Sequence, residues 1–303
     1  MRQPASLPPI GRSPSFSTYA AQLAGVNRSR LRRADLVSPF HGVRRNAADQ
    51  PITVEERCKA YATVMPEGMF FSHTTAATLY GLPLPALDSA AIHVAAPRHR
   101  RAPRAQGVVG HRVTVAEEDV RSVRGLRVPR PEEVLCQLAS LLDHDALVRV
   151  GDAMVRRKLP LSTMEQLSSA VSAAEARPGV RTLRRALESV RARTDSPMET
   201  TLRLAIIRGG LPEPLVNHRI GLGANRVAHL DLAYPDRRIA IEYDGDHHRT
   251  DDRQFHIDGD RLWRIEAAGW RVIRVNRSHM SDGAHEAVRR VRLALTSMGR
   301  NTP

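Results

Sequence analysis

The 303-residue sequence predicts an α/β protein with three parts: an N-terminal helix-and-hairpin segment, an α+β middle region and a C-terminal α/β sandwich around a mixed sheet. Three observations predict this fold class. Helical periodicity and basic residues dominate the first 50 residues, helices and short apolar strands alternate over 51–158, and four strand-like runs interleave with helices after residue 195. Hydrophobic residues make up 42% of the chain, which suffices for two or three compact cores at this length.

Composition and periodicity divide the chain into five segments. Pro, Ser and Arg dominate the first residues, which we expect to be disordered. Capping signals and a Pro-Gly pair mark a helical connector before the last domain. The predicted segments are a disordered tail (1–14), a winged-helix-like segment (15–50), an α+β middle region (51–158), a helical connector (159–194) and a final α/β domain (195–298).

The winged-helix-like segment is predicted from the order of its elements. A short helix begins after Ser17 or Thr18, and a second, arginine-rich helix begins after Asn27 or Ser29. A hairpin over 36–44 follows, which completes the order of a winged helix-turn-helix. Its arginines can bind DNA phosphates, or they can form the solvated face of a small helical subdomain. The arginines concerned are Arg28, Arg30, Arg32, Arg33 and Arg44.

In the middle region, a capping box starts a helix at Thr53, and strands are predicted at 91–95 and 108–113. Ser72 and His73 are adjacent, but neighbouring residues on a helix point in different directions and do not form a catalytic pair. We therefore interpret Ser72 as a helix cap and His73 as a packed or solvent-facing side chain.

Residues 15–158 resemble the antitoxins and transcriptional regulators of the AbiEi type. The resemblance is carried by the winged-helix order, by Ser-His-Thr-Thr-Ala-Ala-Thr-Leu-Tyr-Gly at 72–81 and by Leu-Ala-Ser-Leu at 138–141. It implies DNA contact or an interaction role for this part of the chain, and no chemistry.

The charge balance points to a polyanionic partner. There are 46 Lys and Arg against 32 Asp and Glu, a net charge of +14. A GC-rich genome would explain why Lys59 and Lys158 are the only lysines, but it would not explain the excess of base over acid. Nucleic acid is the commonest large polyanion, so we expect DNA as the partner.

Other partners and compartments are limited by what the sequence lacks. Cys58 and Cys136 have neither partners nor spacing typical of a zinc site, and we expect them to be reduced core residues. No apolar run approaches the roughly 20 residues needed to cross a bilayer, and the N-terminus has no signal-peptide core. We expect a cytoplasmic protein with no membrane partner and no small-molecule cofactor.

Acidic residues are predicted to converge in the final domain. Asp231 lies within a strand at 226–234, and Glu242 and Asp244 lie two apart on the next strand, 239–244, so their side chains share one face. The short turn between the strands brings Asp231 close to Glu242. Carboxylates this close repel one another unless a cation neutralises them, which predicts a Mg²⁺ or Mn²⁺ site.

The other elements of this domain complete a sandwich. A Ser-Pro-x-Glu signal starts its first helix, and a glycine ends the long helix before its last strand. The remaining predicted elements are helices at 197–208, 254–269 and 286–298 and strands at 214–220 and 270–275.

Residues 195–298 resemble the PD-(D/E)xK nuclease superfamily, and within it an endonuclease-like family related to very-short-patch repair endonucleases. The matching runs are Ser-Pro-Met-Glu at 196–199, Asp-Leu-Ala-Tyr at 231–234, Ile-Glu-Tyr-Asp-Gly at 241–245, His-His at 247–248, Asp-Arg at 260–261 and Gly-Trp-Arg-Val-Ile-Arg at 269–274. The resemblance implies a restriction-endonuclease-like fold and Mg²⁺-dependent hydrolysis of DNA. It also implies that Asp231 and Glu242 bind the metal, that the Tyr243 carbonyl is a further ligand, and that Glu199 approaches the metal or holds a ligand water.

One position departs from the family pattern. Asp244 stands where the usual motif has lysine, and it can be an extra metal ligand. His247 or His248 can then orient or deprotonate the attacking water, because imidazole titrates near neutrality. Arg261 or Arg274 can replace the charge of the lysine on the phosphate, but not its proton chemistry.

Three alternatives stay open. The chain can be a non-catalytic DNA-binding regulator with a degenerate nuclease fold, in which Asp231 and Glu242 form structural ion pairs with Arg237 or Arg274. The substrate can be RNA instead of DNA. The protein can act as a homodimer, because many such nucleases use two copies to cut both strands.

Overall fold

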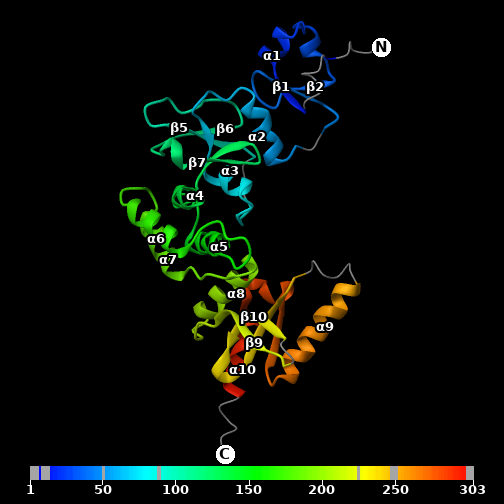
Figure 1. Cartoon of the computed structure of the whole chain (residues 1–303), viewed down its shortest axis with the longest axis vertical. Helices are drawn as coiled ribbons and strands as arrows, with labels where there is room; N and C mark the ends of the chain where they lie inside the picture. Colours follow the sequence, from blue (N-terminus) through cyan, green and yellow to red (C-terminus); the bar gives the residue numbers. More distant parts are fainter. Residues whose placement is uncertain are drawn as a thin grey trace, which may run out of the picture. The chain divides into compact units, whose positions relative to one another are not determined.

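The computed structural model describes residue 7 and residues 14–49, 52–86, 90–223, 226–245 and 252–297, with the backbone alone over 252–258. The chain forms two compact units, Met1–Leu141 and Leu142–Pro303 (Figure 1). Both are mixed α/β structures with mixed sheets, as the sequence predicts. Most of the predicted disordered tail lies outside the described residues.

In its described residues, the first unit contains two three-stranded sheets and a separate hairpin. Its elements are β1 (Ser15–Ser17), α1 (Thr18–Leu23), η2 (Arg30–Arg32), β2 (Leu36–Val37), β3 (Val43–Asn46), α2 (Val54–Ala62), β4 (Phe70–Phe71), α3 (His73–Leu79), β5 (Ile92–Pro97), β6 (Val108–Val113), η3 (Glu117–Asp119), β7 (Val120–Val123), β8 (Leu126–Pro129) and α4 (Pro131–Leu138).

The prediction of a basic α-helix after Asn27 is wrong, because this segment forms only a single 3₁₀ turn, η2. The backbone leaves the helical region at Arg33, which is extended with ψ of 150°, so the turn is not continued. The Arg44 guanidinium donates to the Leu31 carbonyl at 2.7 Å, and the Leu36 N–H donates to the Arg33 carbonyl at 3.0 Å. The predicted first helix is present and capped by the Ser17 hydroxyl, and β2 and β3 form the predicted hairpin.

The second sheet of this unit has the order β4-β5-β6, with β5 and β6 parallel. The predicted capping box is present at Thr53, and both predicted strands are present as β5 and β6. Ser72 occupies the N-cap position of α3, but its hydroxyl contacts the ring of His73 and caps no backbone N–H.

The second unit contains a four-stranded sheet and six α-helices in its described part. Its elements are α5 (His144–Met154), α6 (Met164–Ala173), α7 (Val180–Ser189), α8 (Pro197–Arg208), β9 (Leu215–Gly221), β10 (Val227–Tyr234), η4 (Pro235–Arg237), β11 (Ile239–Asp244), α9 (Asp252–Ala267), β12 (Arg271–Asn276), η6 (Arg277–Met280), η7 (Asp282–Ala284) and α10 (His285–Ser297). The residues predicted as a connector, 159–194, and α5 before them belong to this unit.

A buried ion-pair network joins α5 to α8. Arg203 is 0% exposed, and its guanidinium donates to Asp152 at 2.9 Å and to Glu213 at 2.8 Å. The Thr200 hydroxyl and the Arg191 N–H also donate to Asp152. Burial raises the pKa of Asp152, and the attraction of Arg203 opposes that rise. The network therefore fixes the start of α8 against helices that precede the predicted final domain.

The sheet has the order β12-β11-β10-β9, with only β11 and β12 parallel. Helices α8 and α10 cover one face through residues such as Leu202 and Val291, and Ile265 of α9 packs on the other face. Figure 1 shows α9 alongside the sheet. Two helix layers thus enclose a mixed sheet, which is the predicted sandwich.

Across the described helices of both units, none combines the length and the apolar character needed to span a membrane.

Candidate functional site

The first acidic group of the site sits at the start of α8. The Ser196 hydroxyl accepts the N–H of Glu199 at 3.2 Å, and Pro197 occupies the first helical turn, as the sequence predicts. The Glu199 carboxylate accepts the N–H of Asp195 at 2.9 Å. This contact holds a carboxylate that is only 4% exposed at the beginning of the helix.

The second acidic group lies where β10 and β11 separate. Leu232 pairs with Ile241 in the antiparallel ladder, and the next residue back, Asp231, accepts the Tyr243 N–H on Oδ2 at 2.9 Å. The Asp231 side chain therefore accepts a backbone N–H of β11 at this point. This hydrogen bond fixes the position of the Asp231 carboxylate beside β11.

The third acidic group, Glu242, is 6% exposed and lies on the face of β11 that α9 covers. Arg261 of α9 donates to Glu242 Oε2 at 2.6 Å and to the His229 carbonyl at 2.5 Å. The other carboxylate oxygen, Oε1, is buried without a hydrogen-bond partner in the described part of the chain.

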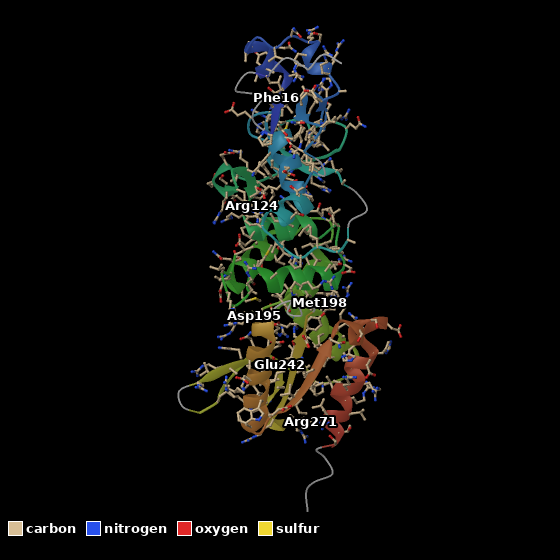
Figure 2. The ribbon with its side chains drawn as sticks, turned by 90° about the vertical axis from the view of Figure 1, so that its right-hand side faces the viewer. Phe16, Arg124, Asp195, Met198, Glu242 and Arg271 are labelled. Atoms are coloured by element: carbon tan, nitrogen blue, oxygen red, sulfur yellow. The ribbon has the colours of Figure 1, made fainter. Side chains whose placement is uncertain are left out.

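These groups line one cavity of about 590 Å³. Figure 2 shows Asp195 and Met198 beside one end of the sheet, with Glu242 on it and Arg271 towards the opposite end. The charged residues around the cavity are Asp195, Glu199, Asp231, Glu242, Asp244, Arg261, Arg274 and Arg277. Five carboxylates and three guanidinium groups thus surround a space large enough for several waters and a phosphate.

Three of these carboxylates, Glu199, Asp231 and Glu242, have raised pKa values. Burial, together with the charge of Asp231, raises the pKa of Glu199 to about 8. The same two causes raise the pKa of Glu242 to about 7 against the opposing effect of Arg261. Burial also raises the pKa of Asp231, although the Tyr243 N–H and Arg261 oppose that rise. The nearby arginines therefore do not fully compensate the negative charge of the three groups.

The residues present fit a hard divalent cation. Mg²⁺ and Mn²⁺ take oxygen ligands, and Glu242 Oε1 is a buried carboxylate oxygen that the described residues leave without a donor. Asp231 and Glu242 are the groups that can hold such an ion, and Glu199 is close enough to Asp231 for their charges to interact. Tyr243 contributes its N–H to the orientation of Asp231.

Asp244, at the position where the resemblance expects lysine, forms an ion pair with Arg274. The Arg274 guanidinium donates to its carboxylate at 2.5 Å, and the two side chains are 45% and 55% exposed. The pair lies at the edge of the cavity. The alternative ion pairs that the sequence allowed for Asp231 and Glu242 differ from those observed, because Arg261 contacts Glu242 and Arg274 contacts Asp244.

Two predicted groups of residues lie elsewhere. His247 and His248 fall outside the described residues, so their position relative to the cavity is not described. Of the N-terminal arginines, Arg30 pairs with Asp35 at 2.8 Å, and Arg44 donates to carbonyl groups of its own unit. The exposed members of that set are Arg28, Arg32 and Arg33.

A polar cluster that was not predicted from the sequence lies at the start of α8. Asp195 binds the Arg157 guanidinium at 2.5 Å and the Asn217 amide at 3.0 Å. Asn217 is 4% exposed and has a left-handed backbone with φ of 50°. An asparagine inside the predicted strand 214–220, where this residue type is disfavoured, is a signal that the sequence does carry. Nothing in the sequence links Arg157 to Asp195, because Arg157 falls in the predicted middle region, 51–158, and Asp195 in the predicted final domain.

Comparisons with known proteins give relatives without an assigned activity. No family model matches the chain. Two Mycobacterium tuberculosis proteins, "Uncharacterized protein MT2308" of strain CDC 1551 / Oshkosh and "Uncharacterized protein Rv2248" of strain ATCC 25618 / H37Rv, are each 27% identical over 199 residues, which is 66% of this chain and 71% of theirs. The crystal structure of the RV2827C protein from the same species matches 70% of this chain and 85% of its own, with 18% identity and a TM-score of 0.41, a likeness too low to support an argument.

Proposed function

We propose that the second unit hydrolyses phosphodiester bonds of DNA in a reaction that depends on Mg²⁺ or Mn²⁺, and that its sandwich is restriction-endonuclease-like. The observation that carries the proposal is the meeting of Glu199, Asp231 and Glu242 in one cavity, with a buried carboxylate oxygen that lacks a donor among the described residues. An arrangement with this much uncompensated acid suits a cation-binding site better than a structural ion-pair network.

The chain's own residues divide the work of this reaction. Asp231 and Glu242 would hold the ion, and the Tyr243 N–H keeps Asp231 in place. When bound, the ion would polarise the phosphate and make a water more acidic. Glu199 would orient a water within the cavity, and Arg261 would bind phosphate oxygens while restraining Glu242.

The first unit would supply DNA affinity through its exposed arginines Arg28, Arg32 and Arg33. Since η2 is too short to act as a recognition helix, we assign these residues to phosphate contact and not to base reading. Tethering such a surface to the second unit would raise the local concentration of DNA near the cavity.

A second candidate is a non-catalytic DNA-binding regulator. The observation that favours it is the Arg274–Asp244 ion pair, at the position where the nucleases that the sequence resembles carry lysine. In that case the acidic cavity would be a remnant, and DNA binding would not depend on a divalent ion.

The test is incubation of the purified full chain with supercoiled plasmid in Mg²⁺, in Mn²⁺ and in EDTA. We expect nicked and then linear DNA with either ion and intact plasmid in EDTA. A labelled RNA of the same sequence serves as the second substrate and decides between DNA and RNA. Intact plasmid under all conditions, with salt-sensitive binding, would contradict the nuclease and support the regulator.

Glu242→Gln tests the electrostatics of the cavity in the metal-free chain. Its pKa of about 7 lies above the ordinary 4.5, so the carboxyl is neutral in both folded and unfolded chains below about pH 4.5 and costs nothing there. As pH rises from about 4.5 to about 7, the unfolded chain ionises at this carboxyl while the folded chain does not, so the wild type loses stability over this window. Relative to wild type, the free energy of unfolding of the variant should therefore rise by about 3 kcal/mol between pH 4.5 and pH 8.

The measurement is urea unfolding in EDTA, followed by tryptophan fluorescence at both pH values. Glu266→Gln is the matched control, because Glu266 is exposed on α9 in the same unit. Saturating Mg²⁺ should stabilise the wild type at pH 8 and the Glu242→Gln chain much less. An unchanged difference between variant and wild type across this pH range would contradict the described environment of Glu242.

A further inference from the structure

Three histidines meet in the first unit, far along the sequence from the acidic cavity. His73 begins α3, His93 lies on β5 and His111 lies on β6. One ring nitrogen from each can be chosen such that the three atoms lie within 4.8 Å of one another. His73 is 8% exposed, and the other two side chains are half-buried.

The sheet places two of these rings on the same face. Strands β5 and β6 are parallel, with His93 opposite Val109 and Ala95 opposite His111. The histidines are thus two register positions apart, so their side chains point to the same side. His111 Nε2 lies 3.0 Å from His93 Nδ1, and the two rings are stacked with centroids 5.0 Å apart.

The backbone of α3 brings the third ring over this pair. The Ser72 N–H donates to the His93 carbonyl at 3.0 Å, and the His93 N–H donates to the Thr75 hydroxyl at 2.8 Å. His73 itself has a left-handed backbone with φ of 50°. This conformation costs a residue other than glycine on the order of 1 kcal/mol, so surrounding contacts must stabilise it. Its N–H is held by the Gln137 side chain at 2.9 Å. The ring of His73 stacks on that of His111 with centroids 3.7 Å apart.

Two of the rings, those of His93 and His111, favour the neutral imidazole form. Burial, with a contribution from His111, lowers the pKa of His93 to about 4, and burial lowers the pKa of His111 as well. Neutral imidazole is the form that binds metal ions. The Ser72 hydroxyl lies 3.0 Å from His73 Nδ1, and a hydrogen bond at one ring nitrogen is the usual device that orients the other toward a metal.

We propose that His73, His93 and His111 form a binding site for a divalent transition-metal ion, with Zn²⁺ as the preferred ion. Zinc–nitrogen bonds of about 2.0–2.1 Å in a tetrahedral site set the ligand nitrogens about 3.4 Å apart, so nitrogens that lie within 4.8 Å of one another need to close by up to about 1.5 Å. Three protein ligands leave the fourth position of a tetrahedral ion for water. Nitrogen donors select zinc-like ions, whereas the oxygen-lined cavity of the second unit suits Mg²⁺ or Mn²⁺, so the two sites differ in the ion they take.

Cobalt substitution provides the test, because tetrahedral Co²⁺ gives strong visible absorption and octahedral Co²⁺ does not. The full chain, without a histidine tag, is stripped with a chelator and titrated with Co²⁺ and then with Zn²⁺. The parent chain carries Asp231→Asn, His247→Gln and His248→Gln, which removes donors of the second unit from the measurement. We expect one equivalent of tetrahedral Co²⁺, displaced by Zn²⁺, and a melting temperature that rises when Zn²⁺ is added.

Substitution of the ligands separates this site from adventitious binding. His93→Gln and His111→Gln are each expected to weaken Zn²⁺ binding by about 100-fold or more, beyond the 10–100-fold cost of losing an outer-shell partner. His99→Gln is the matched control, because His99 is exposed just beyond the end of β5 and should leave binding unchanged.

Two results would overturn the proposal: a parent chain that binds less than one equivalent of Zn²⁺, or ligand variants that bind as tightly as the His99→Gln control. Far-UV circular dichroism of the metal-free variants shows whether they are folded. If both ligand variants are unfolded, the parent chain decides, since a histidine cluster that only packs gives neither tetrahedral Co²⁺ absorption nor stabilisation by Zn²⁺.

Discussion

Replacing Asp231 with asparagine is expected to lower the initial rate of Mg²⁺-dependent plasmid nicking by about 10³-fold or more. Asparagine is nearly isosteric and keeps an oxygen that can accept the Tyr243 N–H, so the strand junction should be preserved. What is lost is the negative charge that would hold the ion. A thousandfold loss corresponds to about 4 kcal/mol, the size expected when charge stabilisation by a bound ion is removed.

Asp236→Asn is the matched control for this experiment. Asp236 is exposed in η4, at the turn between the same two strands, and its substitution should leave nicking unchanged. Nicking that persists in Asp231→Asn at the wild-type rate would mean that a contaminant or another site cleaves the DNA. Equal loss in both variants would point to a folding defect, which circular dichroism detects.

Replacing Arg203 with methionine is expected to destabilise the second unit by about 3–5 kcal/mol. Methionine fills much of the volume of the arginine but leaves Asp152, whose side chain is 1% exposed, without its cationic partner. The cost should shrink at acidic pH, because protonated Asp152 no longer needs that partner. The chain has two tryptophans, Trp263 and Trp270, and both lie in this unit, so urea unfolding followed by fluorescence reports on it directly.

Two further variants show whether buried charge is the cause. Arg208→Met removes an arginine of the same helix that is 64% exposed and pairs with Asp145, and it should cost at most about 1 kcal/mol. Asp152→Leu combined with Arg203→Met removes both charges and should recover part of the lost stability. A loss below about 1 kcal/mol in Arg203→Met alone would contradict the role assigned to the network.

The order of elements in the final domain could be predicted because each one is marked locally. Apolar runs define the strands, the Ser196 signal starts α8, and Gly269 follows the end of α9. The pairing of β10 with β11 also follows from the short turn between them, which is why Asp231 and Glu242 could be brought together from sequence alone. Whether these residues bind metal remains a prediction.

The features that sequence did not predict depend on tertiary contacts. The arginines after Asn27 have helical spacing, yet the backbone is extended at Arg33 and only a single 3₁₀ turn forms before it. The Asp195–Arg157 ion pair joins residues 38 apart, on either side of an expected boundary. The histidine cluster could not be predicted for the same reason. His73, His93 and His111 are far apart in the sequence, and only the packing of a helix start on two strands brings them together.

The Asp152–Arg203 contact also has a consequence for how this protein can be divided and recombined. A fragment that begins at Asp195 would retain the acidic cavity and the Glu213 partner of Arg203, but it would lose Asp152 from beside Arg203 and Arg157 from beside Asp195. The smallest fragment that keeps both the Asp152–Arg203 and the Arg157–Asp195 ion pairs begins at α5. A gene fusion that transferred only the last hundred residues would thus move the proposed catalytic groups without the scaffold that orients them, so the module available for exchange between proteins is the whole second unit.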